Sequence, residues 1–317
     1  MLGKVLFIDK AHPLLETELT KMGFQCEPGW ELSKGEVEAL LDQYIGLVIR
    51  SRFAFDAEFL AKGTNLTFLA RTGIGLEHVD LAYAEKAGIS VFNSPEGSKY
   101  TVGEHALGML LMLMNHLNRA DREVRNGQWI REGNRGTELR GKIVGIVGYG
   151  NTGQEFAKRL QGFDVEVLAY DKYKSNYGNA YAKAVSLATI WERSDVVSFH
   201  IPYERDNHYL VNTDYLSHFQ KPIYLINTAR GLILNTADLV DSLKKGRVLG
   251  VALDVIEYEE TSFAHLDLDQ LPEPFQYLRR AQNVVLTPHI AGWSHEAKVG
   301  HAQVLVDKIR QKFQGKA

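Results

Sequence analysis

The chain has 317 residues, of which 45% are hydrophobic and 24% charged, and its formal net charge is −3. This composition is ordinary for a globular protein in water, and the length allows two domains with separate cores. The lack of a basic excess or a polybasic run argues against nucleic acid and against a charged membrane surface as partners. The single cysteine, Cys26, excludes an intrachain disulfide and favours a reducing, cytoplasmic setting.

Short β-rich runs alternate with helix-like segments in the first hundred residues, and this alternation favours parallel α/β layers. Thr101 and Glu104 fit a capping box, which predicts that Thr101 caps a long helix ending near Arg125. The apolar stretch Ala106–Leu117 inside that helix is too short for a bilayer span, which needs about 20 residues. The strands expected before it are Val5–Asp9, Leu47–Arg50, Phe68–Ala70 and Ser90–Asn93.

A second α/β series follows the polar, glycine-containing stretch Gly127–Gly141. Its strand count matches that of one dinucleotide-binding domain. A last helix, roughly Ser294–Phe313, comes after the series is complete, so we expect it to pack back on the first domain. The six strands expected are Lys142–Val147, Val165–Tyr170, Asp195–His200, Tyr224–Asn227, Leu249–Asp254 and Asn283–Leu286.

A G-x-G-x-x-G run stands at the first turn of the second series, as Gly148, Tyr149, Gly150, Asn151, Thr152 and Gly153. The expected strand precedes it, and a helix from Thr152 to Leu160 follows. In this context the glycines allow a tight turn, close approach of a pyrophosphate and close helix packing, and the helix N-terminus attracts phosphate. Asp171 ends the next strand and would accept hydrogen bonds from the adenosine ribose. A carboxylate there repels a 2′-phosphate, so NAD is preferred to NADP, although Lys172 and Lys174 work against that preference.

Three further segments end later strands of the series and carry the residues Arg230, Glu259 and His289. In parallel sheets, ligands bind beyond the carboxyl ends of the strands, so these side chains can converge on one site. A histidine suits proton transfer at neutral pH, and a carboxylate behind it orients the ring. The arginine fork matches a carboxylate in a bidentate manner. Glu257 and Glu260 are alternatives for the carboxylate, and no ligand spacing recommends a metal site.

With these motifs the chain resembles the D-isomer-specific 2-hydroxyacid dehydrogenase family over essentially its whole length. The resemblance implies two doubly wound parallel-sheet domains with the active site between them, and a homodimer. A Rossmann-type NAD-binding domain, 99–288, is inserted in a flavodoxin-like substrate domain formed by 1–98 and 289–317. The activity implied is hydride transfer between NAD and C2 of a 2-hydroxy or 2-oxo acid.

The resemblance also assigns roles by position. Arg230 binds the substrate carboxylate and polarises the C2 oxygen, His289 is the acid/base, and Glu259 holds the histidine. The backbone N–H groups of Ile74 and Gly75 bind the substrate carboxylate. Positions that line the cofactor are Thr101, His200, Asn207, Thr228, Ala229, Asp254 and Gly292, in addition to the glycine motif and Asp171; many relatives have threonine at the position of Asn207.

The substrate is predicted from Arg50, which ends a strand of the first domain, with Arg52 after it and Arg135 across a dimer as further charges. Phosphoglycerate dehydrogenases have a similar Arg-Ser pair, which favours D-3-phosphoglycerate. The alternative is that Arg50 and Arg52 are solvated surface charges, an interpretation that suits Arg52 better than Arg50. In that case glyoxylate or hydroxypyruvate fits as well. An alternative of another class is a nicotinamide-sensing corepressor, which the expected absence of partner-recruiting tails disfavours. The acidic, aromatic-rich segment Thr261–Tyr277 looks longer than in many relatives, and it either lengthens the lip of the cleft or is a surface excursion.

Overall fold

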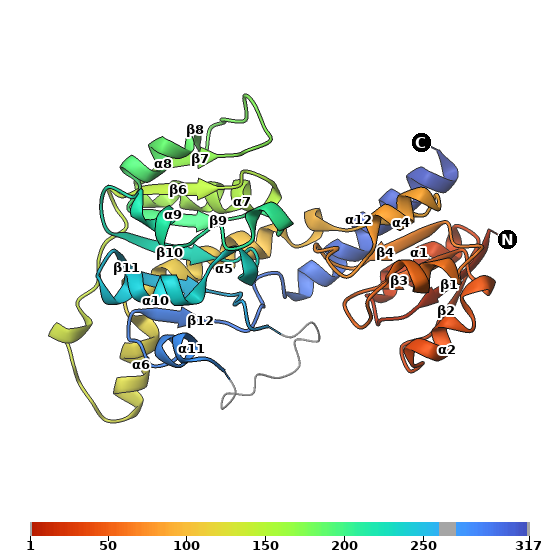
Figure 1. Cartoon of the computed structure of the whole chain (residues 1–317), viewed down its shortest axis with the longest axis horizontal. Coiled ribbons are helices and arrows are strands. Elements are labelled where there is room, and N and C mark those ends of the chain that lie inside the picture. Colours follow the sequence, from red (N-terminus) through yellow and green to blue (C-terminus); the bar gives the residue numbers. More distant parts are fainter. Residues whose placement is uncertain (1, 260–270, 316–317) are drawn as a thin grey trace. The chain divides into compact units, whose positions relative to one another are not determined.

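The chain divides into two units, which are described separately, in a computed structural model that describes residues 2–259 and 271–315 (Figure 1). The smaller unit holds the residues up to Ser98 and those from Trp293 onward. The larger unit is Lys99–Gly292. The second crossing between units was predicted before His289 and lies after Gly292. The backbone amides of His289, Ile290 and Ala291 bond to Asp254, which holds this segment in the larger unit.

The smaller unit has a five-stranded parallel sheet in the order β2-β1-β3-β4-β5, the flavodoxin-like order. Helices α1 and α12 share one hydrophobic core with one face of this sheet, and α2, α3 and α4 pack on the other face. The elements are β1 Gly3–Phe7, α1 Pro13–Lys21, β2 Phe24–Pro28, α2 Lys34–Glu38, β3 Gly46–Ile49, α3 Ala57–Ala61, β4 Phe68–Arg71, α4 Leu81–Lys86, β5 Ser90–Phe92, the 3₁₀ helix η2 Pro95–Gly97, and α12 His295–Gln314.

The larger unit has a seven-stranded parallel sheet in the order β12-β11-β10-β9-β6-β7-β8. Read from β6, this is the Rossmann order with one added strand at the β12 edge. One face is covered by α5 and α7, and the other by α8 to α11. The elements are α5 Lys99–Met114, α6 Leu117–Arg125, β6 Ile143–Val147, α7 Asn151–Arg159, β7 Glu166–Tyr170, β8 Lys183–Ala184, α8 Leu187–Arg193, β9 Val196–Phe199, α9 Thr213–Ser217, β10 Ile223–Asn227, α10 Thr236–Lys244, β11 Val248–Leu253, α11 Glu273–Leu278 and β12 Val284–Leu286.

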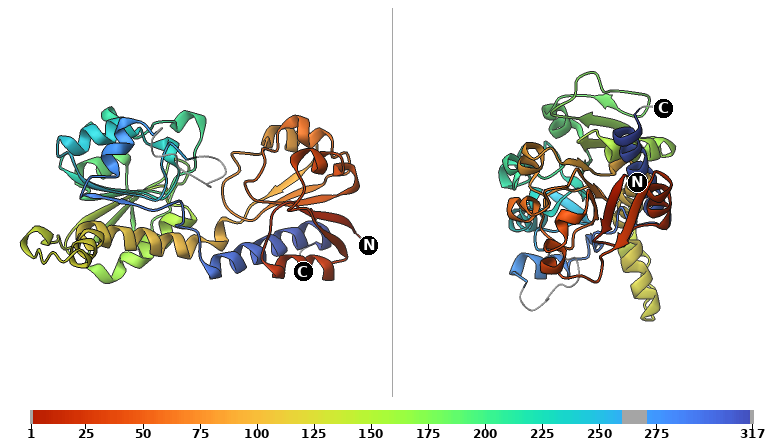
Figure 2. Two further views of the ribbon diagram at one scale, coloured as in Figure 1. Left: turned by 90° about the horizontal axis from the view of Figure 1, so that it is seen from below. Right: turned by 90° about the vertical axis from the view of Figure 1, so that its right-hand side faces the viewer.

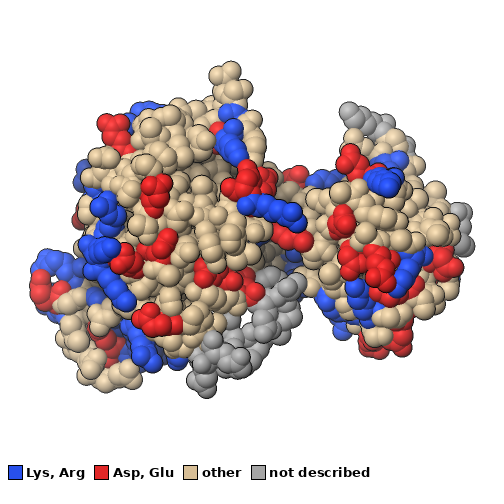
Figure 3. Space-filling view, in the orientation of Figure 1, with Lys and Arg blue, Asp and Glu red and all other residues tan. Residues whose placement is uncertain are grey.

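All ten strands expected from the sequence are present, and the last helix packs with the smaller unit as predicted. The central strands β3 and β9 are buried at every position, which is why each reads as a continuous apolar run. Two parallel-sheet domains of this kind confirm the predicted fold class. Acidic and basic side chains are interspersed over the visible face of each unit (Figure 3).

The capping prediction for Thr101 is wrong. Helix α5 begins at Lys99, so Thr101 lies inside its first turn, and Glu104 pairs with Arg159 instead of closing a cap. The predicted long helix is also interrupted after Met114, where His116 adopts a left-handed backbone with φ 54°. Helix α6 then begins at Leu117 and buries none of its residues.

Candidate active site

The glycine-rich turn follows β6 and leads into α7, as expected. Gly148 has φ +93°, and a Cβ there would lie 2.5 Å from the carbonyl oxygen of His200. A Cβ on Gly153 would lie 2.2 Å from the carbonyl oxygen of Gly148, so α7 packs against the turn only because this residue is glycine. A Cβ on Gly150 would meet nothing within 4 Å, and no side chain caps the start of α7. This leaves backbone N–H groups at a positive helix end, which suits a pyrophosphate.

Asp171 lies at the end of β7, beside the turn. One carboxylate oxygen accepts from the amide of Tyr149 at 2.9 Å and the other from the amide of Tyr173 at 3.0 Å. The side chain is half-buried, and each carboxylate oxygen can accept a second hydrogen bond. Both lysines nearby have partners: Lys172 pairs with Asp206, and Lys174 donates to the carbonyl oxygen of Tyr149.

Tyr149 points away from the turn. Its ring is fully buried in the core between the sheet and helices α5 and α7, and its hydroxyl bonds to the side chain of Asn179 at 2.9 Å. The sequence prediction that this residue binds the cofactor is therefore restricted to its backbone.

His200 and Thr152 meet below the turn. The Nδ1 atom of His200 lies 3.2 Å from the hydroxyl of Thr152, and Nε2 lies 2.8 Å from the hydroxyl of Ser198. Burial lowers the pKa of His200 to about 3, so the ring is neutral at physiological pH. This histidine therefore brings no charge to the turn, and its hydrogen bonds link Thr152, in the first turn of α7, to Ser198 in β9.

The segment after β10 carries the next predicted residues. Asn227 clamps it, because its side chain accepts from the amide of Ala229 and donates to the carbonyl oxygen of Arg230. The hydroxyl of Thr228 is buried and has no hydrogen-bond partner within 2–259 and 271–315. A buried hydroxyl without a partner is costly, and a bound ligand would satisfy it. Together with the open Gly150, this fits a dinucleotide at the carboxyl edge of the sheet.

Asn207 lies in the segment after β9 and bonds within that segment. Its side chain accepts from the amide of Glu204 at 2.9 Å and donates to the carbonyl oxygen of Pro202 at 2.8 Å. These bonds occupy one donor and one acceptor of the amide.

Arg230 follows Thr228 and Ala229 and directly precedes Gly231. A Cβ on Gly231 would lie 2.0 Å from the carbonyl oxygen of Ile256, so this segment approaches the one after β11 more closely than any other residue would allow. Arg230 is half-buried, and its Nη1 donates to the carbonyl oxygen of Ala229 at 2.7 Å. The close approach brings the segment that carries Arg230 next to the segment that carries Glu259.

The side chains of His289 and Glu259 form a hydrogen bond between the segments that follow β12 and β11. The Nδ1 atom of His289 lies 2.7 Å from Oε2 of Glu259, and the other carboxylate oxygen accepts from the amide of Ile256 at 2.6 Å. This leaves Nε2 as the ring atom that faces away from the carboxylate. The alternative Glu257 accepts from the amide of Thr236 at the start of α10, and Glu260 lies outside the described residues.

Asp254 anchors the backbone around His289. It is 1% exposed, and its carboxylate accepts from the amides of Ile290 and Ala291 and from the hydroxyl of Thr287 at 2.6–2.9 Å. Burial alone would raise the pKa of this carboxyl, but His105, Thr287 and the two amides together hold it below its usual range. The anchor matters because His289 has φ 54°, a left-handed conformation that is strained for histidine.

His105 was missed in the sequence. Its Nε2 atom lies 3.1 Å from the hydroxyl of Thr287 and 3.5 Å from Oδ1 of Asp254, so a residue of α5 helps to hold the Asp254 carboxylate in place. A signal was present, since His105 is next to Ala106 and one turn before Met109 on the buried face of a helix. A histidine at such a position needs polar partners in the core.

In the smaller unit, the residues predicted to bind the substrate carboxylate follow β4. The amides of Ile74 and Gly75 donate no hydrogen bond within the described part of the chain. The guanidinium of Arg71 lies against the same segment, since a Cβ on Gly73 would lie 1.2 Å from its Nη1 atom. The sequence did not single out Arg71, although it ends a parallel strand at the same edge as Arg50.

Arg50 directly follows β3, and its guanidinium lies 4.6 Å from the ring centre of Trp293. The prediction for Arg52 is wrong in both of its forms. Its guanidinium bonds to the backbone carbonyl oxygens of Ile8, Trp30 and Leu32, so it is neither a solvated charge nor free to meet a substrate. Arg135 pairs with Glu132 at the surface of the larger unit.

The described residues contain no group of three or more histidine, cysteine, aspartate or glutamate side chains that could hold a metal ion. Within the same residues, no helix has both the length and the hydrophobicity to cross a bilayer.

Comparison with known proteins agrees with this geometry. Residues 107–291 match the D-isomer specific 2-hydroxyacid dehydrogenase, NAD binding domain family. D-3-phosphoglycerate dehydrogenase of Archaeoglobus fulgidus is 32% identical over 310 residues, covering 96% of this chain but only 57% of the relative, so this chain spans little more than half of that protein. Hydroxypyruvate reductase of Thermotoga maritima is 33% identical over 278 residues, covering 88% of each chain. The structure of D-lactate dehydrogenase from Aquifex aeolicus with NAD and lactic acid is 25% identical, with a TM-score of 0.81, and the match covers 99% of this chain and 96% of that chain.

Proposed function

Because the chain belongs to the D-isomer specific 2-hydroxyacid dehydrogenase family, and its larger unit is the NAD-binding domain of that family, we propose that it interconverts a 2-hydroxy acid and a 2-oxo acid with NAD as the cofactor. The observation that carries the proposal is the pair of His289 and Glu259, with Arg230 on the neighbouring segment, at the same sheet edge as the glycine-rich turn.

The turn Gly148–Gly153 would hold the pyrophosphate, Asp171 the adenosine ribose, and Thr228 and Ala229 the groups beyond it. Thr101, His200, Asn207, Asp254 and Gly292 complete the proposed lining. When bound, NADH supplies the hydride that reduces C2 of the 2-oxo acid, and NAD⁺ takes it back in the reverse direction.

The protein residues handle the proton and the charges. In reduction, His289 donates a proton from Nε2 to the C2 oxygen, and in oxidation it removes the hydroxyl proton. Glu259 holds the ring through Nδ1 and stabilises the imidazolium. Arg230 binds the substrate carboxylate and polarises the C2 oxygen, while the amides of Ile74 and Gly75 bind carboxylate oxygens. General acid–base catalysis of this kind is worth about 10²–10⁴ in rate.

The proposed substrate is D-3-phosphoglycerate, or 3-phosphohydroxypyruvate in the reductive direction. Arg50 directly follows β3, and Arg71 is the last residue of the neighbouring strand β4, so two guanidinium groups lie at one edge of the sheet. The ring of Trp293 contacts the guanidinium of Arg50. Guanidinium groups suit a phosphate because they bond to two of its oxygens at once. Similarity to a hydroxypyruvate reductase and to a glyoxylate reductase favours hydroxypyruvate or glyoxylate as the alternative.

The experiment for the proposed function follows NADH absorbance with 3-phosphohydroxypyruvate, hydroxypyruvate and glyoxylate. Substrate-dependent oxidation of NADH with at least one of them supports the dehydrogenase, and the ranking of kcat/KM gives the substrate. Tight NADH binding without turnover of any 2-oxo acid would instead favour the nicotinamide-sensing protein.

Replacement of Arg50 by alanine should raise KM for 3-phosphohydroxypyruvate by roughly 10- to 100-fold, the worth of charge-assisted bonds to a phosphate. The KM for hydroxypyruvate, which lacks the phosphate, should change by less than about threefold. Steady-state kinetics on both substrates measures the difference, and Lys86→Ala, at an exposed lysine of the same unit, is the matched control. An equal loss on both substrates would refute the role of Arg50.

Replacement of Asp171 by asparagine should weaken NADH binding and narrow the preference for NADH over NADPH by about tenfold, because the charge that repels a 2′-phosphate is lost. Asparagine keeps one oxygen for the backbone amides that Asp171 now bonds. Dissociation constants from nicotinamide fluorescence measure this. Asp164→Asn, at an exposed left-handed turn residue, is the control. Equal affinity of the unmodified protein for both cofactors would overturn the assignment.

We also propose a homodimer in the cytoplasm. Helix α6 buries no residue, and the segment after it exposes Trp129 at 80% together with Ile130 at 46%. Helix α6, in yellow, projects beyond the seven-stranded sheet (Figure 2). Sedimentation equilibrium should give twice the mass of one chain, and Trp129→Glu should shift the protein towards the monomer. A monomeric wild-type protein at micromolar concentration would contradict the dimer.

A further inference from the structure

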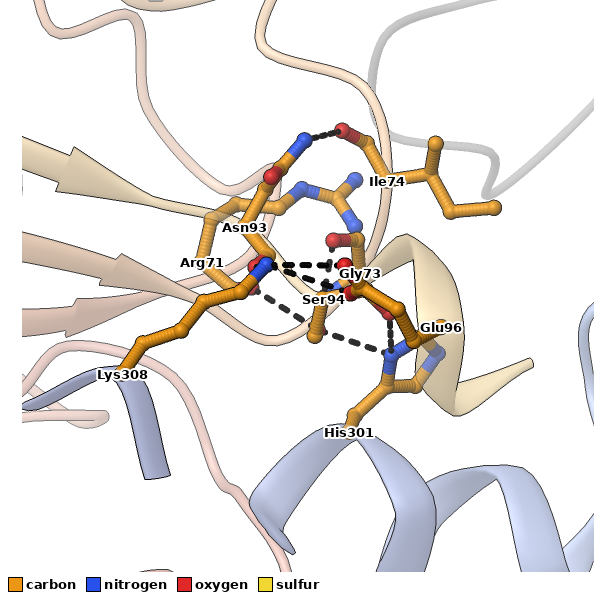
Figure 4. A network of polar contacts seen from close by, with 8 residues as sticks. All are labelled: Arg71, Gly73, Ile74, Asn93, Ser94, Glu96, His301 and Lys308. Atoms are coloured by element: carbon orange, nitrogen blue, oxygen red, sulfur yellow. Dashed lines mark hydrogen bonds and ion pairs between the residues drawn. The ribbon is translucent and has the colours of Figure 1, made fainter. Parts of the chain in front are cut away.

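A network of polar contacts joins α12 to the segment after β4 within the smaller unit (Figure 4). Its centre is Ser94, which follows β5 and is completely buried. Its outer members are His301 and Lys308 on α12, and Gly73 and Ile74 in the proposed carboxylate-binding segment.

Ser94 and Gly73 bond to each other through backbone and side chain. The amide of Ser94 donates to the carbonyl oxygen of Gly73 at 2.8 Å, and the amide of Gly73 donates to the hydroxyl of Ser94 at 3.0 Å. The hydroxyl hydrogen has two carbonyl oxygens within reach, those of Arg71 at 3.2 Å and Gly73 at 3.3 Å. Ser94 therefore fixes the residue directly before Ile74 and Gly75.

His301 holds Ser94 in turn. Its Nδ1 atom lies 2.9 Å from the carbonyl oxygen and 2.8 Å from the hydroxyl oxygen of Ser94. A carbonyl oxygen can only accept, so Nδ1 carries the proton and the ring donates to Ser94. Burial lowers the pKa of His301 to about 4, so the neutral ring makes these contacts at physiological pH.

Two glycines bring His301 to this place. A Cβ on Gly300 would lie 2.4 Å from the carbonyl oxygen of Gly97, and a Cβ on Gly97 would lie 2.5 Å from the amide nitrogen of His301. Helix α12 therefore packs directly on η2, and its next residue meets Ser94. This close packing serves no step of the proposed reaction. It places a half-buried, neutral histidine against Ser94, which in turn contacts the segment of the carboxylate-binding amides.

A second path runs beside the first. Lys308 donates to the carbonyl oxygen of Asn93 at 2.9 Å and pairs with Glu96. The side chain of Asn93 donates to the carbonyl oxygen of Ile74 at 2.7 Å. The carbonyl side of Ile74 is thus fixed, while its amide donates to no described residue.

We propose that His301 is a positioning residue which, through Ser94, holds the backbone of Gly73–Gly75 so that the amides of Ile74 and Gly75 face the substrate carboxylate. The inference rests on the proposed function for the identity of that ligand. The carboxylate is common to every 2-oxo acid, so His301 acts on all such substrates alike, in contrast to Arg50, which distinguishes the phosphorylated one.

The test compares His301→Ala and His301→Asn with His295→Ala, an exposed histidine at the start of the same helix. His301→Ala should raise KM by about tenfold for 3-phosphohydroxypyruvate, hydroxypyruvate and glyoxylate alike, since misplaced amides weaken a bond to a charged group. The kcat should change less than about threefold, because the carboxylate is bound equally before and during the reaction. His301→Asn should restore most of the loss, since its amide nitrogen replaces Nδ1–H.

Hydrogen–deuterium exchange, read by mass spectrometry on the peptides that contain Gly73 and Ser94, gives a second readout that needs no substrate. These amides should exchange about tenfold faster in His301→Ala than in the wild type or in His295→Ala. Unchanged exchange and unchanged KM would overturn the positioning role, as would a rise in KM confined to the phosphorylated substrate. Faster exchange in a protein that turns over no 2-oxo acid would support the positioning role and reject the proposed function, so the two failures are distinct.

Discussion

His289→Ala is expected to lower kcat for 2-oxo acid reduction by about 10²–10⁴, the usual contribution of general acid–base catalysis. The Nδ1 atom of His289 is held by Glu259 at 2.7 Å, which leaves Nε2 to deliver the proton to the C2 oxygen. In the variant, water can still supply a proton, but it is not held at the C2 oxygen, so kcat falls. The affinity for NADH stays close to that of the wild type. Stopped-flow or steady-state kinetics at saturating NADH measures it.

The control for this prediction is His218→Ala. His218 lies 3.7 Å from Asp214 at the surface of the same unit, so it matches the residue type and the acidic neighbour without the position. Glu259→Gln adds a second arm: without a charged partner for the imidazolium, the pH profile of the reduction should move towards lower pH. Full activity of His289→Ala would defeat the assignment of the acid/base.

Arg230→Lys is expected to lower kcat/KM by about 10- to 100-fold, corresponding to the loss of charge-assisted hydrogen bonds that a single ammonium cannot restore. The local structure explains the demand for arginine, because Gly231 lets this segment approach Ile256 and the guanidinium is already directed by a bond to Ala229. A lysine keeps the charge but lacks the planar fork.

The matched control is Arg247→Lys, at an exposed arginine of the larger unit whose side chain bonds only to the carbonyl oxygen of Ser217 among the described residues. Kinetics on each active 2-oxo acid should show the loss in Arg230→Lys alone, and a similar loss on all of them, since all carry the carboxylate. Wild-type kcat/KM in Arg230→Lys would place the carboxylate clamp on another residue.

The buried strands were predictable because their apolar runs are bounded by polar segments, and parallel strands are covered on both faces. The two missed strands lie at sheet edges, where this signal fades. In β2 only Phe24 is buried and the strand ends at Pro28, while both residues of β8 are exposed. The break after Met114 has neither glycine nor proline to mark it.

The candidate active site, like the strands, was predictable where a regular feature of the fold places its residues. Residues at the carboxyl ends of parallel strands could be predicted, because the fold brings these ends to one edge, and His289 indeed meets Glu259 there. What the sequence could not give were contacts set by tertiary packing. Arg52 turns inward to three backbone carbonyl oxygens, and Tyr149 fills the core instead of facing the turn. The position of His301 depends on the close approach of Gly97 and Gly300, which are 203 residues apart in the sequence, so no local pattern predicts it.

The most direct measurement of the central claim uses NADH carrying deuterium at C4 of the nicotinamide, on the transferred face, with the best 2-oxo acid found in the absorbance assay. Mass spectrometry of the 2-hydroxy acid should find one deuterium at C2 for each molecule of cofactor oxidised, and none when solvent water carries the label instead. A product without deuterium at C2, or with deuterium at C2 taken from labelled water, would contradict direct hydride transfer by this protein.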